Sequence, residues 1–174
     1  MKIRKCQAED LSILDSRIPS GGLTSFHRQR FGRQLDGVGT YLTAWRDGVP
    51  AGHLEIRWRG CDAASVQQAV ADCPELNALG VWPLQLQSQG IGTALITSAE
   101  RLVEQRGFHR VGLGVADDND RARALYLRLG YLDCGIHFRS EWSWVDTDGV
   151  SHHESEPATF LVKDFQAGPQ SLSG

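Results

Sequence analysis

A short glycine-containing turn constrains this chain more than any other feature. Gln87-Ser88-Gln89-Gly90-Ile91-Gly92 follows an apolar, strand-like run at residues 76–81 and precedes a long helical pattern that begins at Ile91. The two glycines let backbone N–H groups turn inward without a Cβ in the way, and the following helix directs its unpaired N–H groups and its positive dipole end to the same point. The turn therefore predicts a site for an anionic group such as a phosphate.

Three kinds of phosphate-binding loop contain such glycines, and spacing separates them. A nucleoside-triphosphate loop requires Gly-Lys-Ser/Thr, which this sequence lacks. A dinucleotide-binding loop requires a small residue where Leu95 stands, with an acidic ribose ligand further along the chain, and it fits poorly. The sequence does match Gln/Arg-x-x-Gly-x-Gly/Ala, the pyrophosphate loop of the GNAT superfamily of N-acyltransferases.

A second motif downstream resembles the same superfamily. Its pattern, Asn-x-x-Ala-x-x-Leu-Tyr-x-x-x-Gly-Phe, is matched with one aromatic exchange at Asn119, Ala122, Leu125, Tyr126, Gly130 and Tyr131. Two signatures in the right order, separated by a helix and a strand of suitable length, are more specific than either alone. The chain thus resembles a GNAT acyltransferase over residues 75–131. One departure is that Pro83 precedes Gln87 by one residue more than in most members, which predicts a bulged approach to the loop.

The resemblance implies an α/β (α+β) fold with a mixed, mostly antiparallel central sheet of six to seven strands, about four flanking helices and splayed central strands. The sequence pattern predicts strands at residues 2–5, 40–46, 51–58, 75–81, 111–116, 131–144 and 159–163. It predicts helices at residues 8–17, 91–107, 120–129 and from a cap at Thr24 or Ser25 to residue 35. Residues 59–74 give mixed signals and are expected to be loop or irregular helix. We predict one domain at residues 1–166 and a flexible tail at 167–174.

The composition indicates a compact enzyme domain in a reducing compartment. With 174 residues and a net charge of −3, the chain can bury one core and shows no electrostatic footprint for nucleic acid or an anionic membrane. Its four cysteines lack Cys-x-x-Cys spacing and no apolar leader or spanning run is present, which predicts a cytoplasmic protein with buried, reduced thiols. We interpret His152-His153-Glu154 as a solvated loop, so no metal is expected.

The resemblance implies acetyl-coenzyme A as the acyl donor and allocates residues to it. The pantetheine arm is expected along the backbone of Leu79, Gly80 and Val81, where Gly80 permits close approach. Asn119 is expected to bond the pantetheine, to cap the following helix, or both. The pyrophosphate is expected at Gln87, Ser88, Gln89, Gly90, Ile91, Gly92 and Thr93.

Two side chains are expected to move protons. Tyr126 stands at the family position whose phenol protonates the departing coenzyme A thiolate, and a phenol with a pKa near ~10 is an available acid at neutral pH. The base that accepts the amine proton is harder to assign. Glu75, at the start of the central strand, is the first candidate, and Glu55 on the preceding strand is the second.

The acceptor is left open by the sequence, beyond a primary amine of a small molecule or a peptide. An aromatic acceptor pocket is one hypothesis, with acidic residues that attract a cationic amine. A non-catalytic acyl-coenzyme A sensor, a different or RNA-borne acyl donor, and a nucleotide-binding domain are the alternatives, and the protein is expected to be a monomer or homodimer. The pocket candidates are His27, Trp45, Trp58, Trp142, Trp144, Glu141, Asp146 and Asp148.

Overall fold

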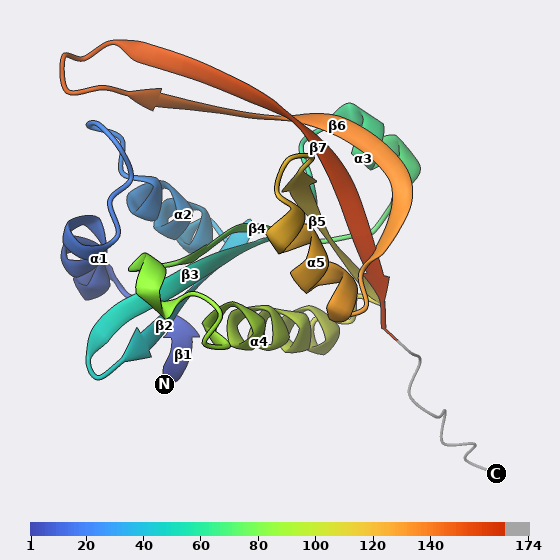
Figure 1. Cartoon of the computed structure of the whole chain (residues 1–174), viewed down its shortest axis with the longest axis horizontal. Helices are drawn as coiled ribbons and strands as arrows, with labels where there is room; N and C mark the ends of the chain where they lie inside the picture. The colour runs from blue at the N-terminus through green and yellow to red at the C-terminus, as the bar shows by residue number, and fades with distance from the viewer. Residues whose placement is uncertain (166–174) are drawn as a thin grey trace.

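The backbone is organised around one central sheet. The computed structural model describes residues 1–165. Within this range seven strands follow the order β1-β2-β3-β4-β5-β7-β6, and only β4 and β5 are parallel neighbours (Figure 1). The predicted mixed, mostly antiparallel sheet is confirmed. The strands are β1 (Lys2–Lys5), β2 (Gly39–Arg46), β3 (Val49–Arg57), β4 (Glu75–Val81), β5 (Arg110–Ala116), β6 (Leu132–Val145) and β7 (Ser151–Asp164).

Helices and 3₁₀ turns connect the strands. Ser25, rather than Thr24, caps α2 by accepting a hydrogen bond from the Arg28 backbone N–H at 3.1 Å. One helix, α3, forms inside residues 59–74, where the sequence signals are mixed. The elements in residues 1–165 are η1 (Ala8–Asp10), α1 (Leu11–Arg17), α2 (Phe26–Leu35), α3 (Ala64–Ala69), η2 (Leu84–Leu86), α4 (Ile91–Gln105) and α5 (Asp120–Arg128).

Alternating side chains on β2 separate two layers of the molecule. Tyr41 packs with Leu11 and Leu14, which belong to α1, whereas Leu42 and Ala44 belong to the larger core on the opposite face. Successive side chains of a strand point to opposite faces of its sheet, so α1 and α4 cover different faces. The buried side of α4 repeats at three- and four-residue spacing, as predicted: Ile91, Leu95, Ile96, Ala99 and Val103.

The two parallel strands diverge almost as soon as they begin. Among the described residues, Glu75 and Gly112 form the only register pair between β4 and β5. The pairing of β4 with β3 also shifts close to Ala78, whose φ is +53°, as expected of a β-bulge. The predicted splay is therefore confirmed. It opens the middle of the sheet beside the glycine-containing loop.

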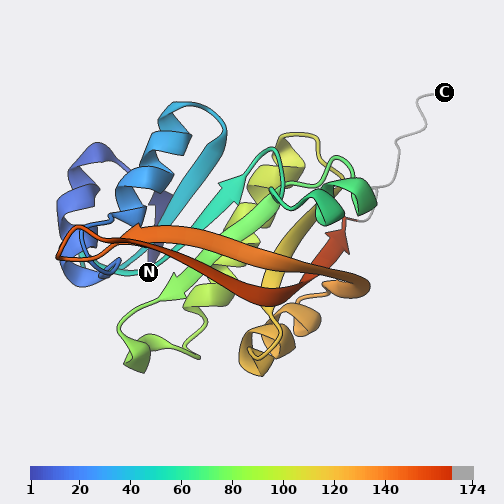
Figure 2. The same ribbon diagram turned by 90° about the horizontal axis from the view of Figure 1, so that it is seen from above.

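The β6–β7 hairpin is long and extends beyond the rest of the sheet. Figure 2 shows it crossing the molecule from the α3 side to the α1 side. Its tip is fixed there, because the Leu23 N–H donates to the Val145 carbonyl at 2.8 Å and the Val145 N–H donates to Thr24 Oγ1 at 2.7 Å. The hairpin thus forms a roof over the splayed strands.

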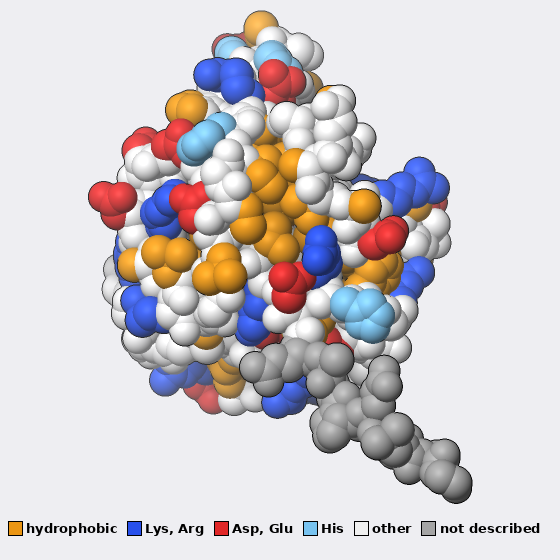
Figure 3. Space-filling model, turned by 90° about the vertical axis from the view of Figure 1, so that its right-hand side faces the viewer, with side chains coloured by type: hydrophobic (Ala, Val, Ile, Leu, Met, Phe, Trp, Pro, Cys, Tyr) orange, Lys and Arg blue, Asp and Glu red, His pale blue; other side chains and the backbone are white. Residues whose placement is uncertain are grey.

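A third, smaller apolar group lies near α3 and the hairpin. It combines Cys61, Val66, Cys73, Phe160 and Val162, with Phe138 of β6 packed against it. Seen from the right-hand side of Figure 1, apolar side chains gather at the centre of the face with charged side chains around them (Figure 3). Inside the molecule, the buried cluster of Cys61, Val66, Cys73, Phe160 and Val162 joins α3 to the hairpin.

Three sequence predictions need correction. β7 begins at Ser151, well before the predicted residue 159, so His152-His153-Glu154 lies in a strand instead of a loop. Cys134 is exposed beside an irregularity in β6, so the prediction of four buried cysteines is wrong for this residue. The approach to the loop, which was predicted to be bulged, is the 3₁₀ turn η2 between Pro83 and Gln87. The predicted tail at 167–174 lies outside the described residues, and no helix within residues 1–165 is long and apolar enough to span a membrane.

Candidate active site

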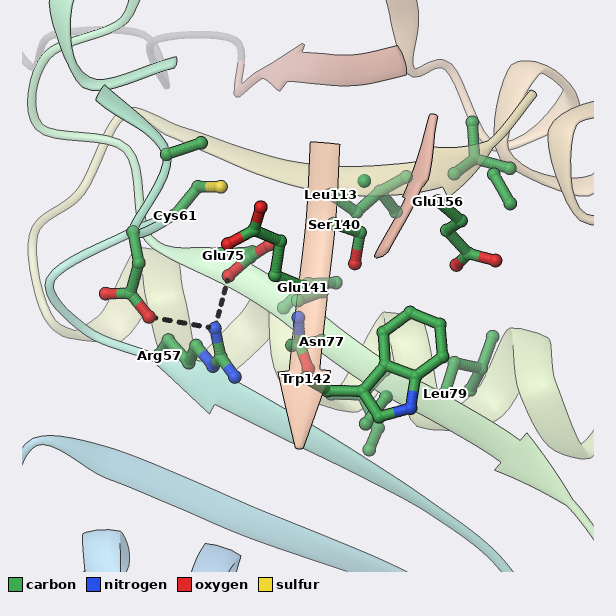
Figure 4. Close-up of a pocket in the computed structure, with 18 of the residues that line it drawn as sticks. Arg57, Cys61, Glu75, Asn77, Leu79, Leu113, Ser140, Glu141, Trp142 and Glu156 are labelled. Atoms are coloured by element: carbon green, nitrogen blue, oxygen red, sulfur yellow. Dashed lines mark hydrogen bonds and ion pairs between the residues drawn. The ribbon is translucent and has the colours of Figure 1, made fainter. Parts of the chain in front are cut away.

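An open cavity of about 700 Å³ lies where β4 and β5 diverge. Side chains from α2, β3, β4, β5, α5 and β6 line it. Figure 4 shows Arg57 and Glu75 at one end and Leu79 at the other, with Trp142 of the hairpin projecting between them. The cavity therefore extends along β4, from its first residue toward the strand end that leads into the loop.

The glycine-containing loop has the backbone geometry expected of an anion site. Gly90 immediately precedes α4 and has a φ of +83°, and Ser88 also has a positive φ, of 62°. This conformation is readily available to glycine and turns the chain sharply into the helix. Gln89 and Gly90 are exposed, whereas Ile91 is buried and Thr93 lies half-buried in the first helical turn. The predicted loop residues thus occur together at the N-terminus of a fifteen-residue helix.

Two arginines that the sequence reasoning missed contact this loop. Arg121 donates from Nη1 to Gln87 Oε1 at 2.6 Å and from Nη2 to Ser88 Oγ at 2.9 Å. On the other side, Arg46 Nη1 donates to Gln89 Oε1 at 2.7 Å. Arg121 lies inside the second motif, but the motif alone does not show that α5 lies beside the loop.

The end of β4 is shaped by a buried histidine. Gly80 pairs with His53 across the β3–β4 ladder, and a Cβ added at Gly80 would lie 2.6 Å from His53 Nε2. Burial lowers the pKa of His53 to about 3, so the imidazole is neutral. A glycine is therefore required at position 80 by the packing of His53. Leu79 lines the cavity and Val81 is half-buried beside it.

Tyr126 projects from α5 to the cavity wall. It is buried, and this burial raises the pKa of its phenol to about 12. Within residues 1–165 its hydroxyl has no hydrogen-bond partner, and the nearest aromatic ring is Tyr131 at 6.1 Å between centroids. The phenol remains protonated at neutral pH and is free to donate.

The other residues of the second motif hold α5 in place. Asn119 Oδ1 accepts a hydrogen bond from the Ala122 N–H at 3.0 Å, which is the capping role predicted for it, and Asn119 also lines the cavity. The hydroxyl of Tyr131 donates to Glu100 Oε1 at 2.9 Å, and Lys163 pairs with the same carboxylate. The motif therefore fixes the helix that carries Tyr126.

Glu75 is a buried carboxyl group at the cavity wall. Only 2% of the residue is exposed, and this burial raises the pKa of Glu75, while Arg57 and Asn77 oppose the shift. Arg57 Nη1 lies 3.5 Å from Glu75 Oε2, a contact drawn in Figure 4, and 3.3 Å from Asp62 Oδ2. A carboxyl group with a raised pKa is a better proton acceptor than an exposed one.

Glu55 has a different environment. Arg33 binds both of its oxygens, from Nε at 2.5 Å and from Nη2 at 2.8 Å, and Glu55 is 1% exposed. Arg57 and Arg30 lie 3.7 and 4.0 Å from Glu55 Oε2. The carboxylate is therefore committed to arginine partners, and the geometry favours Glu75 over Glu55 as the base.

The predicted aromatic pocket forms only in part. Trp142 and Glu141 line the cavity. Elsewhere, Trp45 lies beneath the Arg4 guanidinium, Trp58 stacks on Phe108, and Trp144 stacks on His152. His27 is buried against Tyr41, and Asp146 and Asp148 belong to the hairpin turn. The hypothesis of a pocket built from all these residues is wrong, because periodicity does not show which face of a strand lines a cavity.

Comparison with known proteins gives the family. The Acetyltransferase (GNAT) family matches residues 9–131. A mycothiol acetyltransferase from Beutenbergia cavernae is 41% identical over 63 residues, which cover 36% of this chain and about a fifth (21%) of that relative. Within residues 1–165, no group of three or more His, Cys, Asp or Glu side chains is placed to hold a metal ion.

Solved structures agree on the fold. The ribosomal-protein-S18-alanine N-acetyltransferase of Escherichia coli superimposes with a TM-score of 0.65 at 20% identity and covers 99% of both chains. A PaiA N-acetyltransferase from Thermoplasma acidophilum, solved with coenzyme A, gives 0.63 at 17% identity over 94% of this chain and 98% of that one. Together with the family match, these likenesses confirm the fold and the enzyme class predicted from the two motifs: the chain belongs to the acetyltransferase (GNAT) family.

Proposed function

We propose that this protein transfers an acetyl group from acetyl-coenzyme A to a primary amine by direct attack in a ternary complex. The observation that carries the proposal is that one cavity contains both Glu75 and Tyr126 at the splay of β4 and β5. Helix α5 links this cavity to the glycine-containing loop, because Tyr126 lines the first and Arg121 contacts the second. Donor and acceptor could therefore meet over β4.

The donor would be held mainly by backbone groups. The pyrophosphate would accept hydrogen bonds from N–H groups between Gln87 and Thr93, where Gly90 turns the chain and the α4 dipole favours negative charge. The pantetheine arm would lie along Leu79, Gly80 and Val81, on the β4 edge that β5 leaves unpaired within the described residues. A backbone N–H there would also stabilise the negative charge that develops on the thioester oxygen.

The proton transfers follow from the two titratable groups. The amine nitrogen attacks the thioester carbon, a C–N bond forms, and Glu75 accepts the proton that the nitrogen loses. The C–S bond then breaks, and Tyr126 protonates the departing thiolate. Burial keeps Tyr126 protonated at neutral pH, and it also raises the pKa of Glu75 toward the range in which a base is effective.

The experiment that tests the proposal measures thiol release from acetyl-coenzyme A with a panel of amines, for the wild type and Tyr126→Phe. Loss of a general acid is expected to lower kcat by roughly 100-fold or more. The Kd for acetyl-coenzyme A, measured by calorimetry, should stay nearly unchanged, since the phenol acts in the transition state. Leu127→Ala is the matched control, because Leu127 is the next residue of α5 and is exposed.

Two other results would give a different function. Equal turnover of Tyr126→Phe would remove Tyr126 as the acid. Tight acetyl-coenzyme A binding without thiol release for any amine would instead support an acyl-coenzyme A sensor. Failure to bind acetyl-coenzyme A would point to another acyl donor.

A further inference from the structure

Three arginines lie at the end of the cavity that contains Glu75, which we call the acceptor end. Arg30 and Arg33 of α2 and Arg57 of β3 all line it. They surround the buried carboxylate of Glu55, and Arg57 also faces Glu75. Three guanidinium groups thus share two buried carboxyl groups, so one guanidinium group has no carboxyl group of its own.

The other charged residues of the cavity are exposed or lie on the hairpin side. Asp62 contacts Arg57, but its side chain is 89% exposed, so water and salt screen the pair. Glu141, Glu156 and Arg139 line the cavity from the hairpin. Arg139 donates from Nε to Ser155 Oγ at 2.7 Å, and this neutral partner leaves its charge in place. Glu141 and Glu156 therefore make the hairpin side of the cavity acidic, whereas the side built by α2, β3 and β4 carries one guanidinium more than it has buried carboxyl groups.

Among the described residues, no carboxylate lies within hydrogen-bond distance of Arg30, and Arg57 Nε is buried without a partner. The Arg30 side chain is 15% exposed and lies against the rings of Phe26 and Tyr41, at 5.6 and 6.0 Å from their centroids. Arg33 already occupies both oxygens of Glu55, and Arg30 Nε lies 4.0 Å from Glu55, beyond hydrogen-bond distance. Burial lowers the pKa of Arg30. Such a desolvated cation is stabilised when an anion binds to it.

We propose that the acceptor is an amine that also carries a carboxylate, and that Arg30, supported by Arg57, binds this carboxylate. The inference rests on the proposed acetyl transfer. A carboxylate carries the single negative charge that the surplus requires, and Arg33 and Glu55 already form a two-point pair of this kind in the same cluster. The amine of the acceptor would lie beside Glu75, and Arg57 Nη1 is 3.5 Å from Glu75 Oε2. The amine and the carboxylate would therefore belong to one short, amino-acid-like skeleton.

The first experiment compares thiol release for matched acceptors with the same skeleton. β-Alanine and γ-aminobutyrate are measured against their uncharged amides. Asp-containing and Asn-containing tripeptide amides form a second arm, which distinguishes a free amino acid from an acidic peptide as the source of the carboxylate. The wild type is expected to prefer the carboxylate-bearing member of a pair by roughly ten- to hundredfold in kcat/KM.

Variants test the assignment of Arg30. In Arg30→Gln the preference should fall to within about threefold, mainly through a higher KM for the acid. Arg30→Lys should retain part of it, because it keeps the charge without the two-point geometry. Arg28→Gln is the control, since Arg28 is 60% exposed on the same helix and pairs with Asp15. The ratio of two acceptors does not depend on the fraction of folded enzyme, so a loss of stability cannot imitate the result.

A binding measurement completes the test without turnover. With coenzyme A present, N-acetyl-β-alanine should raise the unfolding temperature of the wild type more than its amide does, and Arg30→Gln should abolish the difference. Equal acetylation of acids and amides, or an unchanged preference in Arg30→Gln, would overturn the inference while leaving the proposed function intact. No thiol release with any amine would instead count against the proposed function, and equal thermal shifts for acid and amide would then also reject the carboxylate site.

Discussion

The proposed donor and acceptor sites are built by different chemistry. The proposed donor site, which continues from the cavity to the loop, consists largely of backbone: a glycine-containing loop, a helix N-terminus and a strand edge left open by the splay. At the acceptor end, side chains from α2, β3 and β4 form a buried network of Arg30, Arg33, Arg57, Glu55 and Glu75. The first arrangement depends mainly on backbone conformation, whereas the second depends on the identity of the side chains.

The largest expected effect lies at the acceptor end. Glu75→Gln removes the proposed base and should lower kcat/KM by roughly 100-fold or more at neutral pH. The base must be deprotonated to act, so the wild-type rate should fall as the pH drops through the pKa of Glu75. Because burial raises that pKa, the decline should begin at a higher pH than for an exposed glutamate.

A pH–rate profile of both proteins checks this prediction. The acidic limb should be absent in Glu75→Gln. Asp62→Asn is the matched control, since Asp62 contacts the same Arg57 but is exposed, and its rate should change by no more than a few-fold. An unaltered acidic limb in Glu75→Gln would remove Glu75 as the base.

The next largest effect is expected at Gly80, where β4 pairs with β3. Gly80→Ala places a methyl group against the His53 ring, at a distance that requires one of them to shift. The free energy of unfolding should fall by about 1–3 kcal/mol, which chemical denaturation can measure. His53→Ala in the same background should recover part of the loss. No destabilisation would show that position 80 tolerates a side chain.

A smaller effect is expected at the phosphate loop. Gly90→Ala forces a residue with a Cβ into a positive φ, at a cost of about 1–2 kcal/mol, and should weaken acetyl-coenzyme A binding by roughly tenfold. Gly107→Ala is the matched control, because Gly107 follows the other end of α4 with a φ of +88° and open space around it. Both variants should lose stability, but only Gly90→Ala should have a higher Kd. Equal Kd values would count against the loop as the pyrophosphate site.

The smallest effect is predicted for Arg121→Gln. The two hydrogen bonds from Arg121 to the loop are exposed, and such contacts contribute about 0.2–1 kcal/mol. The Kd for acetyl-coenzyme A should rise by a few-fold, more at low salt than at high salt. A salt-independent Kd in the wild type would show that this arginine does not interact with the donor.

The contrast between the two ends also explains what the sequence could reveal. The glycine-containing loop is a run of consecutive residues with a fixed backbone requirement, so a turn into a helix at Gln87 to Gly92 could be predicted without a structure. Asn119 and Tyr126 lie within one helix and its cap, and their spacing was equally local. The fold and its splayed strands followed from these two motifs.

The acceptor end could not be predicted in this way. Arg30, Arg57 and Glu75 belong to three separate elements. The β3–β4 register pairs Arg57 with Glu75, and the packing of α2 on the sheet brings Arg30 to them. The length of the hairpin was also underestimated, because residues 151–157 extend beyond the neighbouring strand β5 and are largely solvated, and they lack the apolar alternation that marks a strand. Pairing with β6, instead of local pattern, makes them a strand.

Thermal unfolding of the wild type, Gly90→Ala and Arg30→Gln with acetyl-coenzyme A, coenzyme A, NAD or ATP tests the central claim most directly. A ligand at ~100 times its Kd adds roughly 2.7 kcal/mol to stability. We predict stabilisation of the wild type and Arg30→Gln by the two coenzyme A compounds, a reduced shift for Gly90→Ala, and none with NAD or ATP. An absent shift with acetyl-coenzyme A, or an equal shift with the nucleotides, would contradict a coenzyme A site built on the glycine-containing loop.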